Sequence, residues 1–221
     1  DYVLEKYELG HKLIDGEPTK ELVDGQDPDK LFVERDILYL KDATDSEEGG
    51  RMVIVLPKQN LSGAQEESVE FRKWLLKKVQ ITAIVDLPRE AFQPHTGTKT
   101  SLVFLKKVKN IPEDYPIFMA VSEAVGHDRR GNPLYKKDAS GMNLLGDDGK
   151  EVIWNDLPEI YAQWNNYVLS GTVKDRTGEH EPSCFVINSK QILNDESRRI
   201  DAWYWDPNKN NLAKELEESI G

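Results

Sequence analysis

Cysteine, long hydrophobic runs and clustered metal ligands are all scarce in this 221-residue sequence. The single cysteine, Cys184, excludes an internal disulfide and agrees with a reducing cytoplasm, where it is expected to be a small buried apolar residue. No run of about 18 apolar residues is present, so the sequence predicts no membrane-spanning helix and no membrane partner. The four histidines and the cysteine are scattered, and no metal site is expected.

Positive charge is also in the minority, because 29 Lys and Arg face 40 Asp and Glu, for a formal net charge of −11. Nucleic-acid binding rests largely on the neutralisation of phosphates by Lys and Arg, so this balance disfavours a broad nucleic-acid-binding face on the chain alone. No Gly-x-Gly-x-x-Gly motif or phosphate-binding glycine loop occurs, which disfavours an unrelated nucleotide-binding α/β enzyme. No signal-peptide pattern is present, and a start at Asp1 is expected of a piece of a longer protein.

Three apolar runs are present and are predicted to be β-strands: 52–56, 81–87 and 101–105. The first is continuously apolar, as expected of a strand in a sheet that helices cover on both faces. Residues 57–80 are long enough for a helical crossover with Ser62 as its N-cap, so the first two strands are expected to be parallel neighbours or near neighbours. Residues 88–99 have no helical period, and the third strand is therefore expected to return antiparallel.

The loop EAFQPHTGTK at 90–99 is the strongest candidate for a functional segment. A connection of this length without secondary structure is uncommon inside a compact domain, and such loops are usually functional or disordered. It contains one aromatic ring, one imidazole, hydroxyl groups and a lysine. The function of the chain is therefore sought in this loop.

The other predicted elements are a helix at 28–41 that follows Asp27, a strand at 117–121, a helix at 157–169 capped by Asp156, a strand at 184–187 and a closing helix at 212–220. Residues 126–131, GHDRRG, predict a hairpin turn whose glycines take positive φ and whose Asp128 pairs with one of the two arginines, with a phosphate-binding or catalytic cluster as the alternative. The Trp-Tyr-Trp run at 203–205 is expected to pack a small C-terminal subdomain, with an interaction patch as the alternative. No internal repeat is apparent.

Four segments in this order resemble one family: LFVERDILYLK at 31–41, GGRMVIVLP at 49–57, IVDLPREAFQPHTGTKTS at 84–101 and GHDRRG at 126–131. They are similar to the modification (methyltransferase) subunit of type I restriction-modification systems, within the adenine-specific DNA methyltransferases, and the resemblance covers nearly the whole chain. It implies methyl transfer from S-adenosylmethionine to the exocyclic amine of a flipped-out adenine. It also implies DNA and the specificity and restriction subunits as partners.

The resemblance implies an α/β fold that contains part of a Rossmann-like methyltransferase sheet. The three predicted strands would be the last three of seven, with the final one antiparallel and inserted between the fifth and the sixth. Residues 1–122 would form the C-terminal half of the catalytic domain. Residues 123–221 would form a small α+β C-terminal extension and a candidate subunit-interaction region.

Two motifs of that family are missing from this sequence. They are the glycine-rich turn that binds S-adenosylmethionine and the Asn-Pro-Pro-Phe/Tyr motif that holds the target amine, both of which precede the segment matching residues 4–10. The chain is therefore expected to be a C-terminal fragment without a catalytic residue, inactive alone, that binds S-adenosylmethionine weakly or not at all. An acidic insert at 42–48 stands where the family has a short Lys-Pro-Gly-Gly turn.

The resemblance assigns roles to side chains of the 90–99 loop. Phe92 matches the aromatic residue that packs on the extruded adenine, and stacking of roughly 1–3 kcal/mol per base offsets part of the cost of flipping. The alternative is a ring that plugs the sheet edge. Contacts to adenine or DNA are assigned to Phe92, His95, Thr96, Gly97 and Lys99, with a solvated loop tip as the alternative for the threonines, glycine and lysine.

Phe32 is the candidate cofactor-binding residue. Val33, Ile37 and Leu40 form the core stripe of the predicted helix, and Phe32 lies about 100° from Val33 on the helical wheel, so it is expected to face elsewhere. In the family an aromatic residue at this position flanks the adenine ring of S-adenosylmethionine. The alternative is a wider buried face that includes Phe32.

A second function belongs to another class, an assembly module of a restriction-modification complex in which the sheet serves only as a scaffold. The acidic composition, the aromatic tail and the missing donor motif agree with that alternative.

Overall fold

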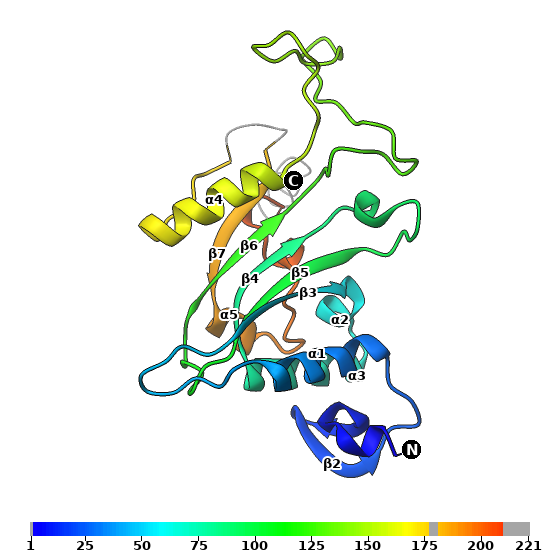
Figure 1. Cartoon of the computed structure of the whole chain (residues 1–221), viewed down its shortest axis with the longest axis vertical. Helices are drawn as coiled ribbons and strands as arrows, with labels where there is room; N and C mark the ends of the chain where they lie inside the picture. The colour runs from blue at the N-terminus through cyan, green and yellow to red at the C-terminus, as the bar shows by residue number, and fades with distance from the viewer. Residues whose placement is uncertain (1, 177–180, 210–221) are drawn as a thin grey trace, which may run out of the picture.

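The computed structural model describes residues 2–176 and 181–209 of the chain (Figure 1). Its centre is a mixed five-stranded sheet in the order β3-β5-β4-β6-β7. These strands are β3 (Arg51–Pro57), β4 (Gln80–Asp86), β5 (Thr100–Lys106), β6 (Pro116–Val121) and β7 (Ser183–Asn188). A separate N-terminal hairpin consists of η1 (Leu4–Lys6), η2 (Glu8–Gly10), β1 (His11–Ile14) and β2 (Glu17–Leu22).

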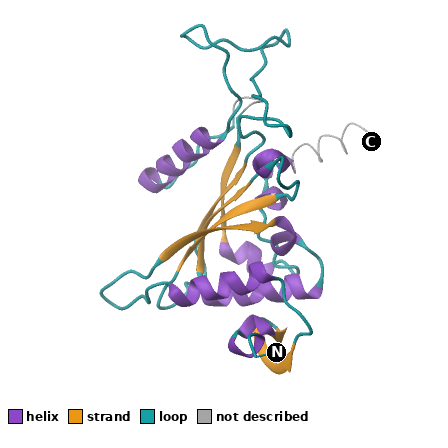
Figure 2. Cartoon of the chain, turned by 45° about the vertical axis from the view of Figure 1, so that its right-hand side comes forward, coloured by secondary structure: helices purple, strands orange, loops and turns teal. Residues whose placement is uncertain are grey.

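Helices lie on both sides of the sheet (Figures 1 and 2). The longer ones are α1 (Pro28–Tyr39) and α3 (Glu66–Lys78) on one side and α4 (Leu157–Ser170) on the other. The shorter ones are α2 (Lys58–Ser62), η3 (Arg89–Phe92), α5 (Ser189–Asn194) and α6 (Ala202–Trp205). The α/β fold class and the helices predicted after Asp27 and Asp156 are therefore confirmed, although neither aspartate makes a side-chain capping hydrogen bond.

The strand order agrees with the order expected from the sequence. β3 and β4 each pair antiparallel with β5, which lies between them, so β3 and β4 are parallel near neighbours. β4 also pairs parallel with β6. β7, which was expected in the C-terminal extension, pairs antiparallel with β6 and continues the same sheet. The division into domains at residue 122 stays a prediction.

The crossover between β3 and β4 differs from the single helix predicted from the sequence. It contains two helices, and Ser62 lies in the last turn of α2 instead of capping α3. The Ser62 hydroxyl donates to the carbonyl of Lys58 at 2.9 Å, and the N–H of Gly63 donates to Gln59 at 2.8 Å. Ser62 thus forms the back-bond that serine makes inside a helix, so its prediction as an N-cap is wrong.

The main core lies between the sheet and the helices α1 and α3. Phe71, Trp74 and Leu75 of α3 are at most 1% exposed, and Val33 and Ile37 of α1 belong to the same cluster. Burying large aromatic and aliphatic side chains contributes roughly 1.5–3 kcal/mol each, so this helical face is the principal source of stability. The apolar spacing seen in the sequence therefore marks the face that meets the sheet.

The opposite face of the sheet is covered at one end only. Phe118 of β6 packs against Trp164 and Tyr167 of α4, with ring centroids 5.4 and 5.8 Å apart. At the other end, Val53 and Val55 of β3 are 54% and 42% exposed. Val53 and Val55 pair with Phe104 and Leu102 of β5, whose side chains lie on the face of the sheet that α4 covers. Among the described residues, β3 is the last strand at this end of the sheet.

An arm of residues 124–156 extends past the carboxyl ends of β4 and β6 (Figure 1). Isolated antiparallel bridges close it, among them Val125 with Asn155 and Tyr135 with Ile153. Gly126 and Gly131 have φ of 91° and 83°, which confirms the predicted turn. One Asp128 oxygen accepts the backbone N–H of Arg130 at 2.7 Å and that of Asn132 at 2.9 Å, and the other accepts the side-chain amide of Asn132 at 3.1 Å. Among the described residues Asp128 forms no ion pair with Arg129 or Arg130, so the predicted pair is not formed.

Cys184 is partly buried in β7, and burial raises the pKa of its thiol to about 12, with the charge of Asp156 adding to the effect. A thiol with so high a pKa stays protonated near neutral pH and is a poor nucleophile. We expect iodoacetamide at about pH 8 to leave Cys184 unmodified in the folded chain and to modify it in urea. Mass spectrometry distinguishes the two, and fast alkylation of the folded chain would contradict the expectation.

Among residues 2–176 and 181–209, no helix is long and apolar enough to cross a membrane. The same residues contain no group of three or more His, Cys, Asp or Glu side chains arranged to hold a metal ion. The helix predicted at 212–220 lies outside the described residues.

Candidate functional site

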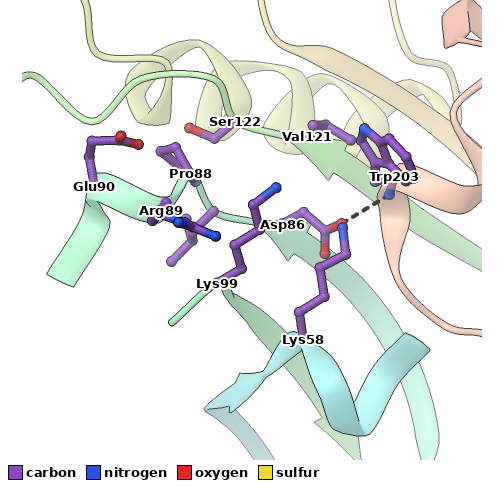
Figure 3. Close-up of a pocket in the computed structure, with 10 residues that line it drawn as sticks. Lys58, Asp86, Pro88, Arg89, Glu90, Lys99, Val121, Ser122 and Trp203 are labelled. Atoms are coloured by element: carbon purple, nitrogen blue, oxygen red, sulfur yellow. Dashed lines mark hydrogen bonds and ion pairs between the residues drawn. The ribbon is translucent and has the colours of Figure 1, made fainter. Parts of the chain in front are cut away.

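The candidate site is a cavity at the carboxyl ends of the parallel strands β4 and β6 (Figure 3). The chain leaving β4 enters the loop 88–99, and the chain leaving β6 enters the arm. Open α/β sheets bind ligands at such points, where the connections from neighbouring strands diverge. The cavity encloses about 470 Å³, and its polar lining includes Lys58, Asp86, Arg89, Lys99, Ser122 and Trp203.

Asp86, the last residue of β4, is the centre of the hydrogen bonding in the cavity. Its side chain is buried and accepts a hydrogen bond from Lys58 Nζ at 2.9 Å. It also accepts from Ser101 Oγ at 2.6 Å and from the backbone N–H of Trp203 at 3.0 Å. The three donors lie in α2, β5 and α6, so one buried carboxylate joins elements that are distant in sequence.

Lys58 connects Asp86 to a second buried carboxylate. Its Nζ lies 3.5 Å from Oδ2 of Asp201, which is fully buried. Asp201 also accepts two hydrogen bonds of 2.9 Å from the guanidinium of Arg199, and this pairing raises the pKa of Arg199. Two acids and two bases therefore alternate in a balanced chain, which holds α6 against the wall of the cavity.

The Trp-Tyr-Trp run at 203–205 takes part in both packing and the cavity wall. Trp205 packs against the main core, and its indole N–H donates to the carbonyl of Arg199 at 2.9 Å. Trp203 is 45% exposed and lines the cavity, with Lys58 Nζ 5.2 Å from its ring centroid. At that distance the ring attracts the ammonium group.

Arg72 of α3 attaches the segment before α6 to the rest of the site. Its buried guanidinium donates to the carbonyls of Asn60 and Gly63 at 3.0 and 2.8 Å and to that of Ser197 at 2.6 and 3.1 Å. Burial lowers the pKa of Arg72 to about 10, so it remains protonated at neutral pH. The carbonyl groups satisfy a cation that would otherwise be costly to bury.

The structure places the predicted loop residues around the cavity in different ways. Lys99 lines it and lies between Arg89 and Asp86 in Figure 3. Phe92 ends η3 with 39% of its side chain exposed, so the ring is not buried in the sheet edge. The remaining predicted residues are exposed on the loop outside the cavity lining: His95, Thr96 and Gly97.

Phe32 lies on α1, apart from this cavity lining. Its side chain is 56% exposed, whereas Val33 and Ile37 of the same helix are 0% and 6% exposed. The wheel argument that separated Phe32 from the core stripe is therefore confirmed for Val33 and Ile37, whereas Leu40 follows the last helical residue and is half-buried. Its predicted contact with a cofactor is a separate matter, and it stays a prediction.

A second cavity of about 440 Å³ lies between the loop 88–99 and the arm. His127 and Arg129 of the arm line it, and Glu90 of the loop lines both cavities. The two cavities are therefore adjacent along the same edge of the sheet. The arm and the loop face each other across the second one.

A sequence profile of N-6 DNA methylases matches residues 27–148, more than half of the chain. The chain belongs to the N-6 DNA methylase family. Its matched segment includes the β4–β5 loop, most of the first cavity and the turn at 126–131. No curated protein matches the chain.

Two solved structures share the fold of this N-6 DNA methylase chain. One concerns complex assembly and conformational transition of a type I R-M system, with a TM-score of 0.55, 18% identity, and 90% of this chain and 38% of that chain covered. The other is the type IIG restriction endonuclease BpuSI, with a TM-score of 0.52, 15% identity, and 97% of this chain and 20% of that chain covered. This chain thus spans less than half the length of either.

Sequence reasoning missed several residues of the site in this N-6 DNA methylase chain. Asp86 has a visible signal, since a carboxylate that ends an apolar strand must find partners if it is buried. Lys58 has a similar signal, because it is a charged residue directly after the apolar strand β3. No local pattern connects Asp201 or Trp203 to the cavity, because both reach it only through the folding of the C-terminal segment.

Proposed function

We propose that the chain is the C-terminal part of the catalytic domain of a DNA adenine-N6 methyltransferase from a restriction-modification system. One observation carries the proposal. The segment that matches the family contains an exposed aromatic ring, Phe92, on a loop that also lines a cavity at the carboxyl ends of β4 and β6. This is the edge of an α/β sheet at which ligands bind.

In this proposal Phe92 stacks on an adenine that has left the duplex. A base must be extruded for chemistry at its exocyclic amine, and an aromatic face compensates for the lost stacking. Arg89 and Lys99 are exposed and have no ion pair within the described part of the chain, which leaves their charge for DNA phosphates. His95, Thr96 and Gly97 add hydroxyl, imidazole and backbone N–H groups on the same loop.

S-adenosylmethionine is the proposed methyl donor, and it supplies the methyl group when bound. The exposed ring of Phe32 fits one part of it, because a flat apolar face is available to a purine. The glycine-rich turn that would hold the rest of the donor is not in this sequence. In this proposal another part of the enzyme completes the donor site, and the 221-residue chain does not methylate alone.

The uncovered end of the sheet supports the proposal of a larger assembly. β3 is the end strand of the described sheet, and its own Val53 and Val55 expose apolar surface. An edge strand with exposed apolar side chains is a site for pairing with a further strand and for covering by a further layer. We propose that the donor-binding half of the enzyme lies there.

A second candidate function is the assembly module, which holds the specificity and restriction subunits and uses the sheet as a scaffold. The outer face of α4 favours it, because Tyr161, Val168 and Leu169 are 66%, 61% and 88% exposed. Changing Leu169 to Asp is expected to reduce co-purification of a partner subunit if this face is an interface. Unchanged co-purification would remove α4 from that role.

The complete enzyme is expected to form N6-methyladenine in duplex DNA from S-adenosylmethionine with a labelled methyl group, whereas the 221-residue chain alone forms none. Digestion of the DNA to nucleosides followed by mass spectrometry identifies the product. A complete enzyme that methylates cytosine, or that transfers no methyl group, would overturn the proposed function. Calorimetric titration of the chain alone tests the missing donor site, and binding at about micromolar affinity would contradict it.

A further inference from the structure

The arm contains three turns with the same backbone hydrogen bonds, at 128–132, 138–142 and 146–150. In each, the N–H of the first residue donates to the carbonyl of the fifth, at 2.8, 2.9 and 2.8 Å. The N–H of the fourth residue, a glycine with φ of 83°, 83° and 74°, donates back to the first carbonyl at 3.0, 2.9 and 2.9 Å. A repeat that is not apparent in the sequence is therefore present in the fold.

The second and third residues of the three turns differ completely in charge: Arg129-Arg130, Ala139-Ser140 and Asp147-Asp148. The same backbone accepts a basic, a neutral and an acidic pair. The turn geometry therefore does not require arginine at 129 and 130. The positive charge at these two positions therefore has no role in the folding of the turn, and we look for its role in binding.

No close ion pair holds either arginine among the described residues. Six lysines each form an ion pair of 2.5–2.9 Å with a nearby acid, whereas the exposed Lys20 and Lys190 have none in the described part of the chain. The six are Lys12, Lys41, Lys77, Lys106, Lys107 and Lys109. Arg129 and Arg130 are exposed, and neither has an ion pair within residues 2–176 and 181–209. The carboxylate of Asp128 accepts hydrogen bonds from the Asn132 side chain and from the backbone N–H groups of Asn132 and Arg130. These bonds and, to a smaller extent, the charge of Arg130 lower the pKa of Asp128.

The position of the turn is set by the base of the arm. The buried carboxylate of Asp156 accepts the N–H of Glu123 at 2.5 Å and that of Ala124 at 3.0 Å. Gly126 then donates to the carbonyl of Trp154 at 2.8 Å. A turn that is held in place before binding loses little conformational entropy when it meets a ligand.

We propose that the turn at 128–132 binds the phosphate backbone of duplex DNA, with Arg129 and Arg130 each contacting a phosphate. Arg129 lines the cavity that separates the arm from the loop carrying Phe92, and Glu90 links that cavity to the first one. DNA engaged by Arg89 and Lys99 of the loop is thereby held on a second side by the arm. This inference rests on the proposed function and extends its DNA-binding surface beyond the loop.

The acids near the turn favour phosphate contacts at the rim over contacts on the cavity floor. Glu90, Glu123 and Asp128 line the second cavity with Arg129. Glu123 forms an ion pair of 3.4 Å with Arg176, and Asp128 is bound to the turn backbone. Glu90 repels a phosphate that enters the floor, whereas Arg130, which does not line the cavity, presents its charge outside it.

The test replaces Arg129-Arg130 by Ala-Ser, the pair that the second turn carries on the same backbone. The affinity of the complete enzyme for a fluorescein-labelled duplex of about 30 base pairs is measured by anisotropy over a range of salt concentrations. A plot of log affinity against log salt has a negative slope, and each lost phosphate contact makes that slope less steep by about 0.9. The double variant is therefore expected to have a slope that is less steep by about 2. The turn itself is expected to stay folded.

The matched control is Lys20→Ala with Lys190→Ala, which removes the same charge from exposed positions that have no ion pair in the described part of the chain. It is expected to leave the slope unchanged. An unchanged slope in the arginine variant overturns the proposal, as does an equal loss in the control. If the arginine variant keeps its slope but loses a co-purifying subunit, the turn is a protein-binding surface and the proposal fails. If the wild-type complete enzyme methylates adenine but the arginine variant shows an unchanged slope, the DNA contact of the arm is refuted and the proposed function stands. If the wild-type complete enzyme does not methylate, the proposed function is refuted.

Discussion

Replacing Lys58 by Met is expected to lower the free energy of unfolding by about 3–5 kcal/mol, because it leaves a buried carboxylate without its cation. Asp86 is 4% exposed and Asp201 is fully buried, and both lie within 3.5 Å of Lys58 Nζ. Arg199 still neutralises Asp201 after the change. Asp86 keeps only the hydroxyl of Ser101 and a backbone N–H. Urea denaturation measures the loss.

Two variants separate this effect from loss of packing. Lys58→Met combined with Asp86→Asn removes both charges at similar volume and is expected to recover part of the stability, as replacement of whole buried pairs often does. Lys12→Met breaks the exposed pair with Glu21, whose side chains are 55% and 67% exposed, and is expected to leave the free energy of unfolding nearly unchanged. Equal losses for Lys58→Met and Lys12→Met would contradict a structural role for the buried pair.

Replacing Phe92 by Ala in the complete enzyme is expected to reduce kcat/KM for methylation roughly 5- to 150-fold, the equivalent of about 1–3 kcal/mol of lost base stacking. The ring is 39% exposed and lies at the end of η3, so its removal creates no large core cavity. The stability of the variant is therefore expected to change little. The measurement pairs initial rates of methyl transfer with urea denaturation.

Conservative and neighbouring changes sharpen the Phe92 experiment. Phe92→Trp keeps a stacking face and is expected to retain most of the activity. Gln93→Ala, next to it on the same loop, serves as a control for general disturbance of the loop. If Phe92→Ala methylates at the normal rate, or if Gln93→Ala loses as much activity, Phe92 does not stack on the target base.

Local sequence was sufficient for the five strands of the central sheet and for α1, α3 and α4, but it did not predict the N-terminal strands β1 and β2 or the short helices α5 and α6. The apolar run that became β3 and the period of Phe71, Trp74 and Leu75 reflect burial by immediate neighbours in the sheet and helix. The antiparallel return of β5 followed from the lack of a helical period in residues 88–99 and is confirmed, although the loop expected to have no secondary structure contains the one-turn 3-10 helix η3. Ser62 was misplaced because an N-cap and a helix-terminal back-bond use the same residue type.

The site was less accessible to sequence reasoning, because its contacts join residues that are far apart in the chain. Asp86 and Trp203 are 117 positions apart and share a hydrogen bond. Arg72 reaches Ser197 across 125 positions. No periodicity or spacing rule covers such separations, so neither pair leaves a local signal.

The sequence alone determined the strands of the central sheet, its longer helices, the family resemblance and the loop that carries Phe92, because apolar periodicity and turn formation depend on residues close in the chain. The tertiary structure decided which charges were engaged and which were left exposed. Folding brings Lys58 together with the buried Asp86 and Asp201 at the carboxyl end of β4. It leaves Lys99, Arg129 and Arg130 exposed at the same edge of the sheet. That division depends on which side chains become desolvated together, and desolvation is a property of the packed molecule.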